Sequence, residues 1–221
     1  MSDIFREVDE EVRQERALAF FQRYWILIAA LAVLIVVSAA GWRFYASHAQ
    51  TLAEADGAAY RQATQLSHDG KSDEALAILD RLARDGAPGY RRLAALRAAD
   101  EYVVVDRARA LKGFDLIAGN GGFDPPLRDL ARLRAAMVQL DMGETGDAQA
   151  RLTPLASGSG PFRNTARELL GVAALNADDF GAAGRWLDEI VRDSGASPDA
   201  RQRANAFLAL VHAGRKPPNK S

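Results

Sequence analysis

The residues able to do chemistry are few and lie far apart along the chain. The three histidines, His48, His68 and His212, form no HExxH or similar metal-ligand spacing. Cysteine is absent, which excludes a disulfide framework, a thiolate nucleophile and a cysteine-based zinc site. We interpret the histidines as surface or capping residues, and we expect no enzyme, no cofactor and no bound metal.

Two local clusters could suggest a ligand site. Asp141, Glu144 and Asp147 lie close in sequence, but the EF-hand pattern is missing and helix capping explains them better. Gly119-Asn120-Gly121-Gly122 lacks the Lys-Ser/Thr pair of a phosphate loop, which favours a flexible connection. Acids and bases are interspersed at a net charge of -1, so no basic stripe supports nucleic-acid binding.

One apolar segment near the N-terminus predicts a transmembrane helix. Residues 24–42 carry no charge and would span roughly 28 Å at ~1.5 Å per residue, close to the ~30 Å hydrocarbon core. Aromatic residues bracket the segment, as is common at membrane interfaces. A buried soluble helix is one alternative, and a signal peptide cleaved near Val37-Ser38-Ala39 is another. The long acidic region before the segment, and its length, favour an uncleaved anchor.

Basic residues near the two ends of this segment predict its direction. The preceding residues 1–23 contain Arg6, Arg13, Arg16 and Arg23, whereas the other side has Arg43 and then no basic residue until Arg61. Arginine and lysine favour the cytoplasmic side. We therefore expect a single-pass protein of the inner (plasma) membrane with its N-terminal arm in the cytoplasm and its C-terminal domain outside, which in a Gram-negative bacterium means the periplasm. The arm's residues Ile4, Phe5, Val8 and Val12 share one helical face.

The remaining sequence contains a degenerate repeat of about 35 residues. Small residues recur at Ala63, Ala98, Ala136 and Gly171, with spacings of 35, 38 and 35 residues. Three further columns follow at fixed offsets: Ala75, Ala110, Ala148, Ala183; Leu79, Phe114, Leu152, Leu187; and Leu82, Ile117, Leu155, Ile190. This spacing predicts helix hairpins that bury their apolar faces only by stacking on one another.

Turn residues divide the chain at the places that such hairpins require. Gly70, Gly143 and Asp178-Asp179-Phe180 fall inside copies one, three and four, but copy two has no glycine turn between Tyr102 and Asp106. The predicted organisation is a cytoplasmic arm (1–23), a transmembrane helix (24–42), a repeat domain (43–213) and a disordered tail (214–221). The repeats are expected at about 52–87, 88–122, 125–160 and 161–196, with a capping helix at 198–213. The predicted fold class is all-α: a single transmembrane helix followed by an α-α superhelix.

The repeats resemble the tetratricopeptide repeat, most closely over Ala166 to Ile190, where Leu170-Gly171, Phe180, Ala183 and Leu187 occupy the family's characteristic positions. The order of acidic arm, anchor, Gly41-Trp42-Arg43-Phe44-Tyr45 and four degenerate repeats is similar to the YfgM-type family. The segment from Gly89 to Arg97 is similar as well. That resemblance implies an ancillary subunit of the SecYEG translocon that associates with periplasmic chaperones such as the PpiD-type prolyl isomerase.

A helical solenoid offers a concave surface for protein partners. The residues that we expect to line it are Tyr60, Tyr102, Leu133, Met137, Leu140, Val172 and Leu175. Leucine and methionine stripes on a helix more often form core, so this alternative stays open. The leading hypothesis is an adaptor that positions chaperones or nascent chains at the Sec exit. The alternative is an envelope scaffold or regulatory protein that acts through its cytoplasmic arm.

Overall fold

The computed structural model describes residues 3–214, with side chains described from Trp25 on except for Ile28. Within these residues the chain is helical and contains no strand, as the composition predicts. It divides into two units, Met1–Glu54 and Ala55–Ser221, which we describe separately. The predicted disordered tail lies in residues 215–221, outside the described residues; Gly214 belongs to the last helix.

The first unit consists of one continuous stretch of helix α1 (Asp3–His68), which also continues into the second unit. The helix includes both the N-terminal arm and the apolar segment. Its most apolar part has a mean hydropathy of 2.4 and is not buried in the protein. This exposure contradicts the alternative of a buried soluble helix. By length and composition, α1 could cross a membrane.

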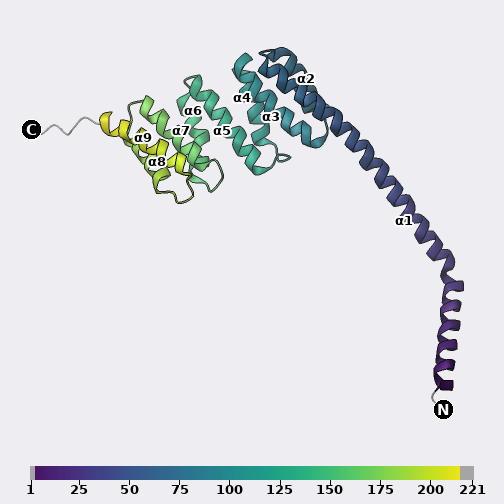
Figure 1. Cartoon of the computed structure of the whole chain (residues 1–221). Helices are drawn as coiled ribbons and strands as arrows, with labels where there is room; N and C mark the ends of the chain where they lie inside the picture. Colours follow the sequence, from purple (N-terminus) through teal and green to yellow (C-terminus); the bar gives the residue numbers. More distant parts are fainter. Residues whose placement is uncertain (1–2, 215–221) are drawn as a thin grey trace, which may run out of the picture. The chain divides into compact units, whose positions relative to one another are not determined.

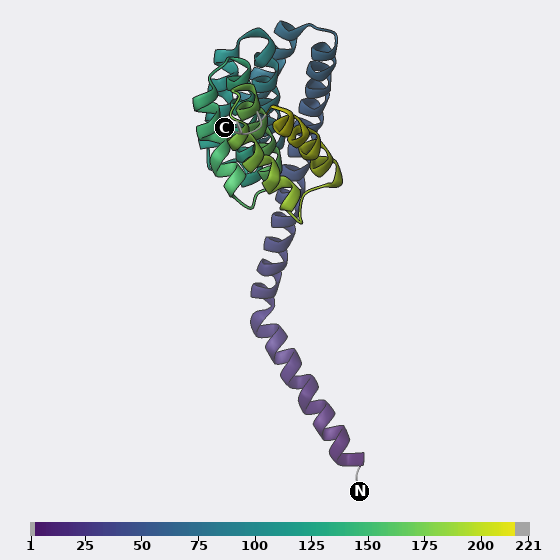
Figure 2. The same ribbon diagram turned by 90° about the vertical axis from the view of Figure 1, so that its left-hand side faces the viewer.

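The second unit is a succession of helix hairpins (Figures 1 and 2). After the end of α1 come α2 (Ser72–Asp85), α3 (Pro88–Val105), α4 (Arg107–Gly119), α5 (Pro125–Asp141), α6 (Thr145–Ser157), α7 (Arg163–Asn176), α8 (Phe180–Arg192) and α9 (Pro198–Gly214). From α2 on, each helix packs against the next. The odd-numbered helices also touch one another, α3 with α5, α5 with α7 and α7 with α9. Among the described residues no such contact joins the even-numbered helices, so the odd helices form the inner row of a superhelix.

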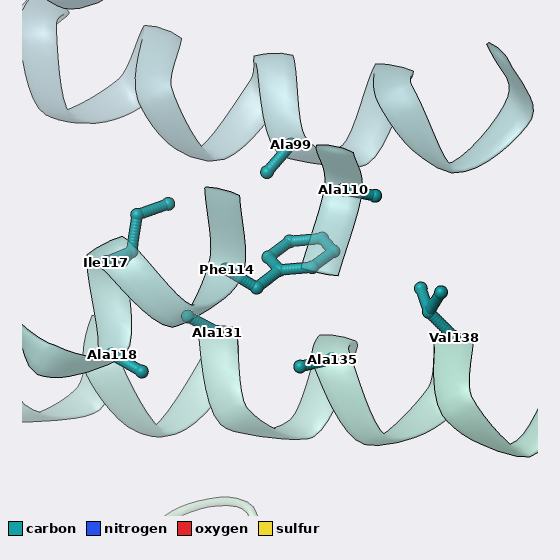
Figure 3. Close-up of a cluster of buried hydrophobic side chains, with 8 residues drawn as sticks. All are labelled: Ala99, Ala110, Phe114, Ile117, Ala118, Ala131, Ala135 and Val138. Carbon is teal, nitrogen blue, oxygen red and sulfur yellow. The ribbon is translucent and has the colours of Figure 1, made fainter. Parts of the chain in front are cut away.

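Four core clusters hold the hairpins together, each centred on one even-numbered helix. Figure 3 shows the cluster around α4, where the Phe114 ring lies between Ala99 on α3 and Ala131 and Ala135 on α5. In the clusters around α2, α6 and α8, large side chains of the even helix pack with alanines of the helices beside it, joined by Leu133 and Leu170 in the α6 cluster and by Val211 in the α8 cluster. Every residue of the four predicted columns is buried. The columns therefore identify the core. We propose that each predicted repeat corresponds to one of these helix pairs.

In copy two, the first column of small residues needs a correction of one position, from Ala98 to Ala99. Ala98 packs in the cluster around α2, the preceding even helix, whereas Ala99 packs against α4, its own hairpin partner. In copy three the corresponding residues are Ala135 and Ala136. The column that faces its own hairpin is thus Ala63, Ala99, Ala136 and Gly171.

The turn inside copy two explains the shift. Three residues separate the helices of the other hairpins, and one of them has a positive φ: Gly70 at 75°, Gly143 at 80° and Asp178 at 56°. In copy two a single residue, Asp106, separates α3 from α4. Its carboxylate accepts a hydrogen bond from the Arg109 backbone N–H at 3.0 Å and so caps α4. Because this turn is shorter, the matching positions of α4 lie one residue closer along the chain to the small residue of α3 than in the other hairpins.

Candidate protein-binding surface

The inner row of odd helices is the surface on which the predicted partner-binding residues should lie. Met137 on α5 has 38% of its surface exposed, although it follows the buried Ala136 directly. Val172 on α7 occupies the equivalent position, one residue after Gly171, and is half-buried. These two residues have side chains accessible from the inner row. Their α3 counterpart is Asp100.

Leu133 is a correction, because it belongs to the core. It is 5% exposed and packs in the α6-centred cluster with Leu152, Leu155 and Leu170. Leu133 lies three residues before Ala136, and this spacing puts it on the side of α5 that faces α6. Leu133 is therefore unavailable to a partner.

Tyr102 is a second correction, and it follows from the register shift in copy two. Its hydroxyl donates a hydrogen bond to Asp80 on α2 at 2.8 Å, and the Arg109 guanidinium of α4 lies 5.7 Å from its ring centre. Burial and the Asp80 hydrogen bond raise the pKa of Tyr102. The ring connects three helices instead of lining the inner row. Val103 takes the position that Leu140 and Leu175 occupy in copies three and four.

The other three predicted residues are half-buried supports of the core. Tyr60 packs on the α2-centred cluster, with its ring centre 6.2 Å from that of Tyr90. Leu140 and Leu175 pack on the clusters around α6 and α8. The structure therefore exposes Met137, leaves Val172 half-buried, and places the remaining predicted residues in or against the core.

Sequence reasoning missed a column of arginines on the odd helices. Arg61, Arg97 and Arg134 each stand two residues before the small residue of their hairpin, and Arg203 holds the same position on α9. The spacing becomes visible only when Ala99 replaces Ala98 in the register. Such a column is a signal that the corrected sequence repeat could have found.

Two of these arginines bridge neighbouring odd helices. Arg134 Nε lies 3.8 Å from Asp100 Oδ1, and Arg203 Nε donates to Glu168 Oε1 at 2.7 Å. Burial raises the pKa of Asp100, and the positive charges of Arg134 and Arg97 oppose that rise. The inner row thus combines apolar side chains with half-exposed ion pairs, an arrangement suited to binding and without a nucleophile and base in contact.

A second polar cluster holds the end of α8 against α7. The Asp193 carboxylate accepts from Arg163 Nη2 at 2.6 Å, Asn164 Nδ2 at 2.9 Å and the Gly195 N–H at 2.9 Å. The hydrogen bonds from Asn164 and Gly195, together with Arg163, lower the pKa of Asp193 to about 2. This cluster positions the turn that leads into α9, so its role is structural.

The remaining candidates from the sequence lie apart from this surface. His48, His68 and His212 are exposed, and the described residues contain no group of three His, Asp or Glu side chains placed to hold a metal ion. Glu144 occupies the N-cap position of α6, but its carboxylate accepts from the Gln139 side chain at 3.3 Å and not from the backbone. Capping therefore does not explain this residue.

An inner row of packed helix hairpins with an accessible apolar and charged face defines a class of protein-binding superhelices. A family model for the tetratricopeptide repeat-like domain matches residues 18–197, most of the chain, and the protein belongs to this family. The match begins before the apolar segment and ends before α9. Comparison with curated proteins gives no significant match. Domains of this kind are typically interaction modules and not enzymes.

Proposed function

We propose that this protein is a membrane-anchored adaptor that binds protein partners on the inner row of its repeat domain. The observation that supports it best is Met137, a large apolar side chain that is 38% exposed one helical turn from Arg134 of the Arg134–Asp100 ion pair. An apolar side chain flanked by charges suits an amphipathic segment of a partner. The exposed apolar length of α1 supports the anchor.

The partners that the YfgM-type resemblance implies are the SecYEG translocon and a periplasmic chaperone of the PpiD type. In this proposal α1 crosses the inner membrane with its N-terminus in the cytoplasm, and the repeat domain faces the periplasm. The adaptor then positions a chaperone or an emerging chain beside the translocon exit. The family match supports the proposal to the extent that it includes both the apolar segment and the repeats.

In-cell photocrosslinking tests the partner surface. A photoreactive amino acid replaces Met137, and Met142 is the matched control because it is 40% exposed but lies at the end of the same helix. We expect translocon or chaperone subunits to be captured from position 137 and not from position 142. Equal capture at both positions, or none from position 137, would contradict the inner row as the binding surface.

Topology is tested separately, so that the anchor and the partner surface can fail independently. Alkaline phosphatase is active only when it is exported; fused after Gly214 it should be active, and fused at residue 23 it should be inactive. The full chain should also stay in the membrane fraction after a carbonate wash. Release of the chain by the wash would contradict the membrane anchor. The opposite phosphatase pattern would contradict the proposed orientation.

A further inference from the structure

A hollow lined by residues of α2, α3, α4 and the connection that follows α4 has an unusual charge. It has a volume of about 900 Å³ and lies between the first and second inter-repeat connections. Its lining includes Ala83, Arg91, Arg92, Ala95, Leu116 and Phe123, and we refer to these residues as the first hollow. Leu116 has 66% of its surface exposed there, a large value for a leucine in a folded helix.

The same place one repeat later is a second hollow of about 690 Å³. Its lining includes Ala118, Asp129, Arg132, Pro154, Leu155 and Phe162. In the corrected register Asp129 is the equivalent of Arg92, and Arg132 is the equivalent of Ala95. The two hollows therefore occupy equivalent places in successive repeats, and the side chains at these two positions give them different charges.

The second hollow neutralises its own charge. Arg132 Nη1 donates to Asp129 Oδ1 at 2.6 Å, and its Nη2 donates to the Ala118 carbonyl oxygen at 3.4 Å. The guanidinium occupies space that the small side chain of Ala95 leaves open in the first hollow. The ion pair thus fills and balances the second hollow from within.

The first hollow has two guanidinium groups and no carboxylate bound to them among the described residues. Arg91 donates through Nε and Nη2 to the Gly86 carbonyl oxygen at 3.2 and 3.1 Å. Arg92 reaches only the Gly122 carbonyl oxygen, at 3.4 Å. Asp115, the acidic residue in the lining, forms its ion pair with Arg151 on α6.

We propose that the first hollow binds a partner's peptide segment that places a carboxylate next to a large apolar side chain. The carboxylate takes the role that Asp129 has in the second hollow, and it pairs with Arg91 and Arg92. The apolar side chain packs on Leu116 and Phe123. Charge complementarity and the apolar lining together select this peptide over a free inorganic anion, which would leave the apolar lining exposed. The site goes beyond the proposed function, because its lining includes neither Met137 nor Val172 and because it does not require the anchor.

The equivalent hollows supply their own test variant. Arg92→Asp combined with Ala95→Arg installs in the first hollow the ion pair that the second hollow already has. Because that pair is accommodated one repeat later, the double variant should fold, which its unfolding temperature checks. Arg91→Gln with Arg92→Gln removes both charges without filling the space. Arg185→Asp, at an exposed position on α8, is the matched control for a charge reversal.

The experiment selects binders from a random display library of short peptides, using the full chain in detergent micelles. On the wild type and on Arg185→Asp we expect enrichment of peptides with Asp or Glu beside Leu or Phe. Both hollow variants should lose that enrichment. For a synthesised selected peptide, fluorescence anisotropy should show an affinity at least about tenfold weaker, the scale of one lost charge-assisted contact.

Three outcomes would overturn the proposal. The first is the same enriched peptides on the wild type and on the double variant. The second is variant-sensitive peptides without an acidic residue, and the third is the absence of any enriched sequence that depends on Arg92. A crosslinking result at Met137 is independent of all three outcomes. Failure of the peptide-binding proposal therefore leaves the adaptor proposal standing, and failure of the adaptor proposal leaves the peptide-binding proposal standing.

Discussion

At the scale of single residues, the packing between helices depends on how close two backbones can approach. Column one has alanine in three copies and glycine in the fourth. A Cβ atom on Gly171 would lie 2.8 Å from Leu187 Cγ, and Leu187 is fully buried. The branch carbon of a leucine locked in the core has little room to move. Glycine is therefore required where the partner helix presents this leucine.

Gly171→Ala should destabilise the domain in denaturant unfolding of the full chain in detergent. Overpacking costs about 1–3 kcal/mol, while replacing a helical glycine returns only about 1 kcal/mol. The control is Gly146→Ala on α6, where an added Cβ meets nothing within 4 Å. That change should be neutral or stabilising. A stabilised Gly171→Ala variant would contradict the close approach of α7 and α8.

The carboxylate of Asp193 makes the stability of the last hairpin depend on pH in the acid range. Its folded pKa of about 2 lies below the ordinary value of 3.8, so its contribution is present above pH 4. That contribution is lost as the pH falls from about 4 to 2. We expect the stability gap between the wild type and Asp193→Asn to narrow over this range, as followed by thermal unfolding. A gap that stays constant between these pH values would show that the carboxylate does not titrate with a lowered pKa.

At the scale of elements, the hairpin turn decides which face of a helix meets its partner. Copy two connects α3 to α4 through Asp106 alone, whereas the other hairpins use three residues with one in the left-handed region. Without glycine, the short turn relies on the Asp106 carboxylate to satisfy the first free N–H groups of α4. The cap takes the place of the left-handed residue that the other turns have.

Asp106→Ala should lower the free energy of unfolding by about 1 kcal/mol, the usual cost of losing an N-cap. Lys71 is the matched control, because it stands at the N-cap of α2 and its side chain makes no capping hydrogen bond. Lys71→Ala should change stability by less than about 0.5 kcal/mol. Equal effects of the two changes in urea unfolding would show that the cap of α4 has no special role.

At the scale of the whole molecule, the superhelix must end without exposing its last apolar layer. Helix α9 contributes Ala200, Ala204 and Val211 to the cluster centred on α8. Its Arg203 also binds Glu168 on α7, and Arg201 donates to the Asp193 carbonyl oxygen at 3.1 Å. Its outer side presents polar residues such as Gln202 and Asn205 to solvent. On this packing we propose that α9 is the predicted capping helix.

Truncation after residue 197 should therefore expose the α8 cluster and lead to aggregation and a lower unfolding temperature. Truncation after Gly214 removes only residues outside the described helix and serves as the control. Size-exclusion chromatography and thermal unfolding of both shortened chains test this expectation. If the shorter chain stays monodisperse and unfolds at the wild-type temperature, α9 does not act as the cap.

Much of this architecture was predictable from the sequence by itself. The helical class, the exposed apolar segment and the buried columns follow from composition and from periods that any stacked hairpin must obey. Phe114, Leu152 and Leu187 could be assigned to the core because large residues at that spacing have no other place to be buried. Of the predicted partner-binding residues Met137 alone is exposed and Val172 is half-buried, and their role in binding remains a proposal.

Only the tertiary structure decided which neighbouring residue faces which helix. One residue along a helix turns a side chain by about 100°, so the short turn at Asp106 gives Val103, and not Tyr102, the position that Leu140 and Leu175 occupy in the later copies. The same sensitivity separates the buried Leu133 from the exposed Met137 on one helix. The charge imbalance of the first hollow was also hidden, because Arg92 and Asp129 become equivalent only after the register is corrected. A repeat period determines the unit, whereas the turns and the packing between helices determine the register inside it.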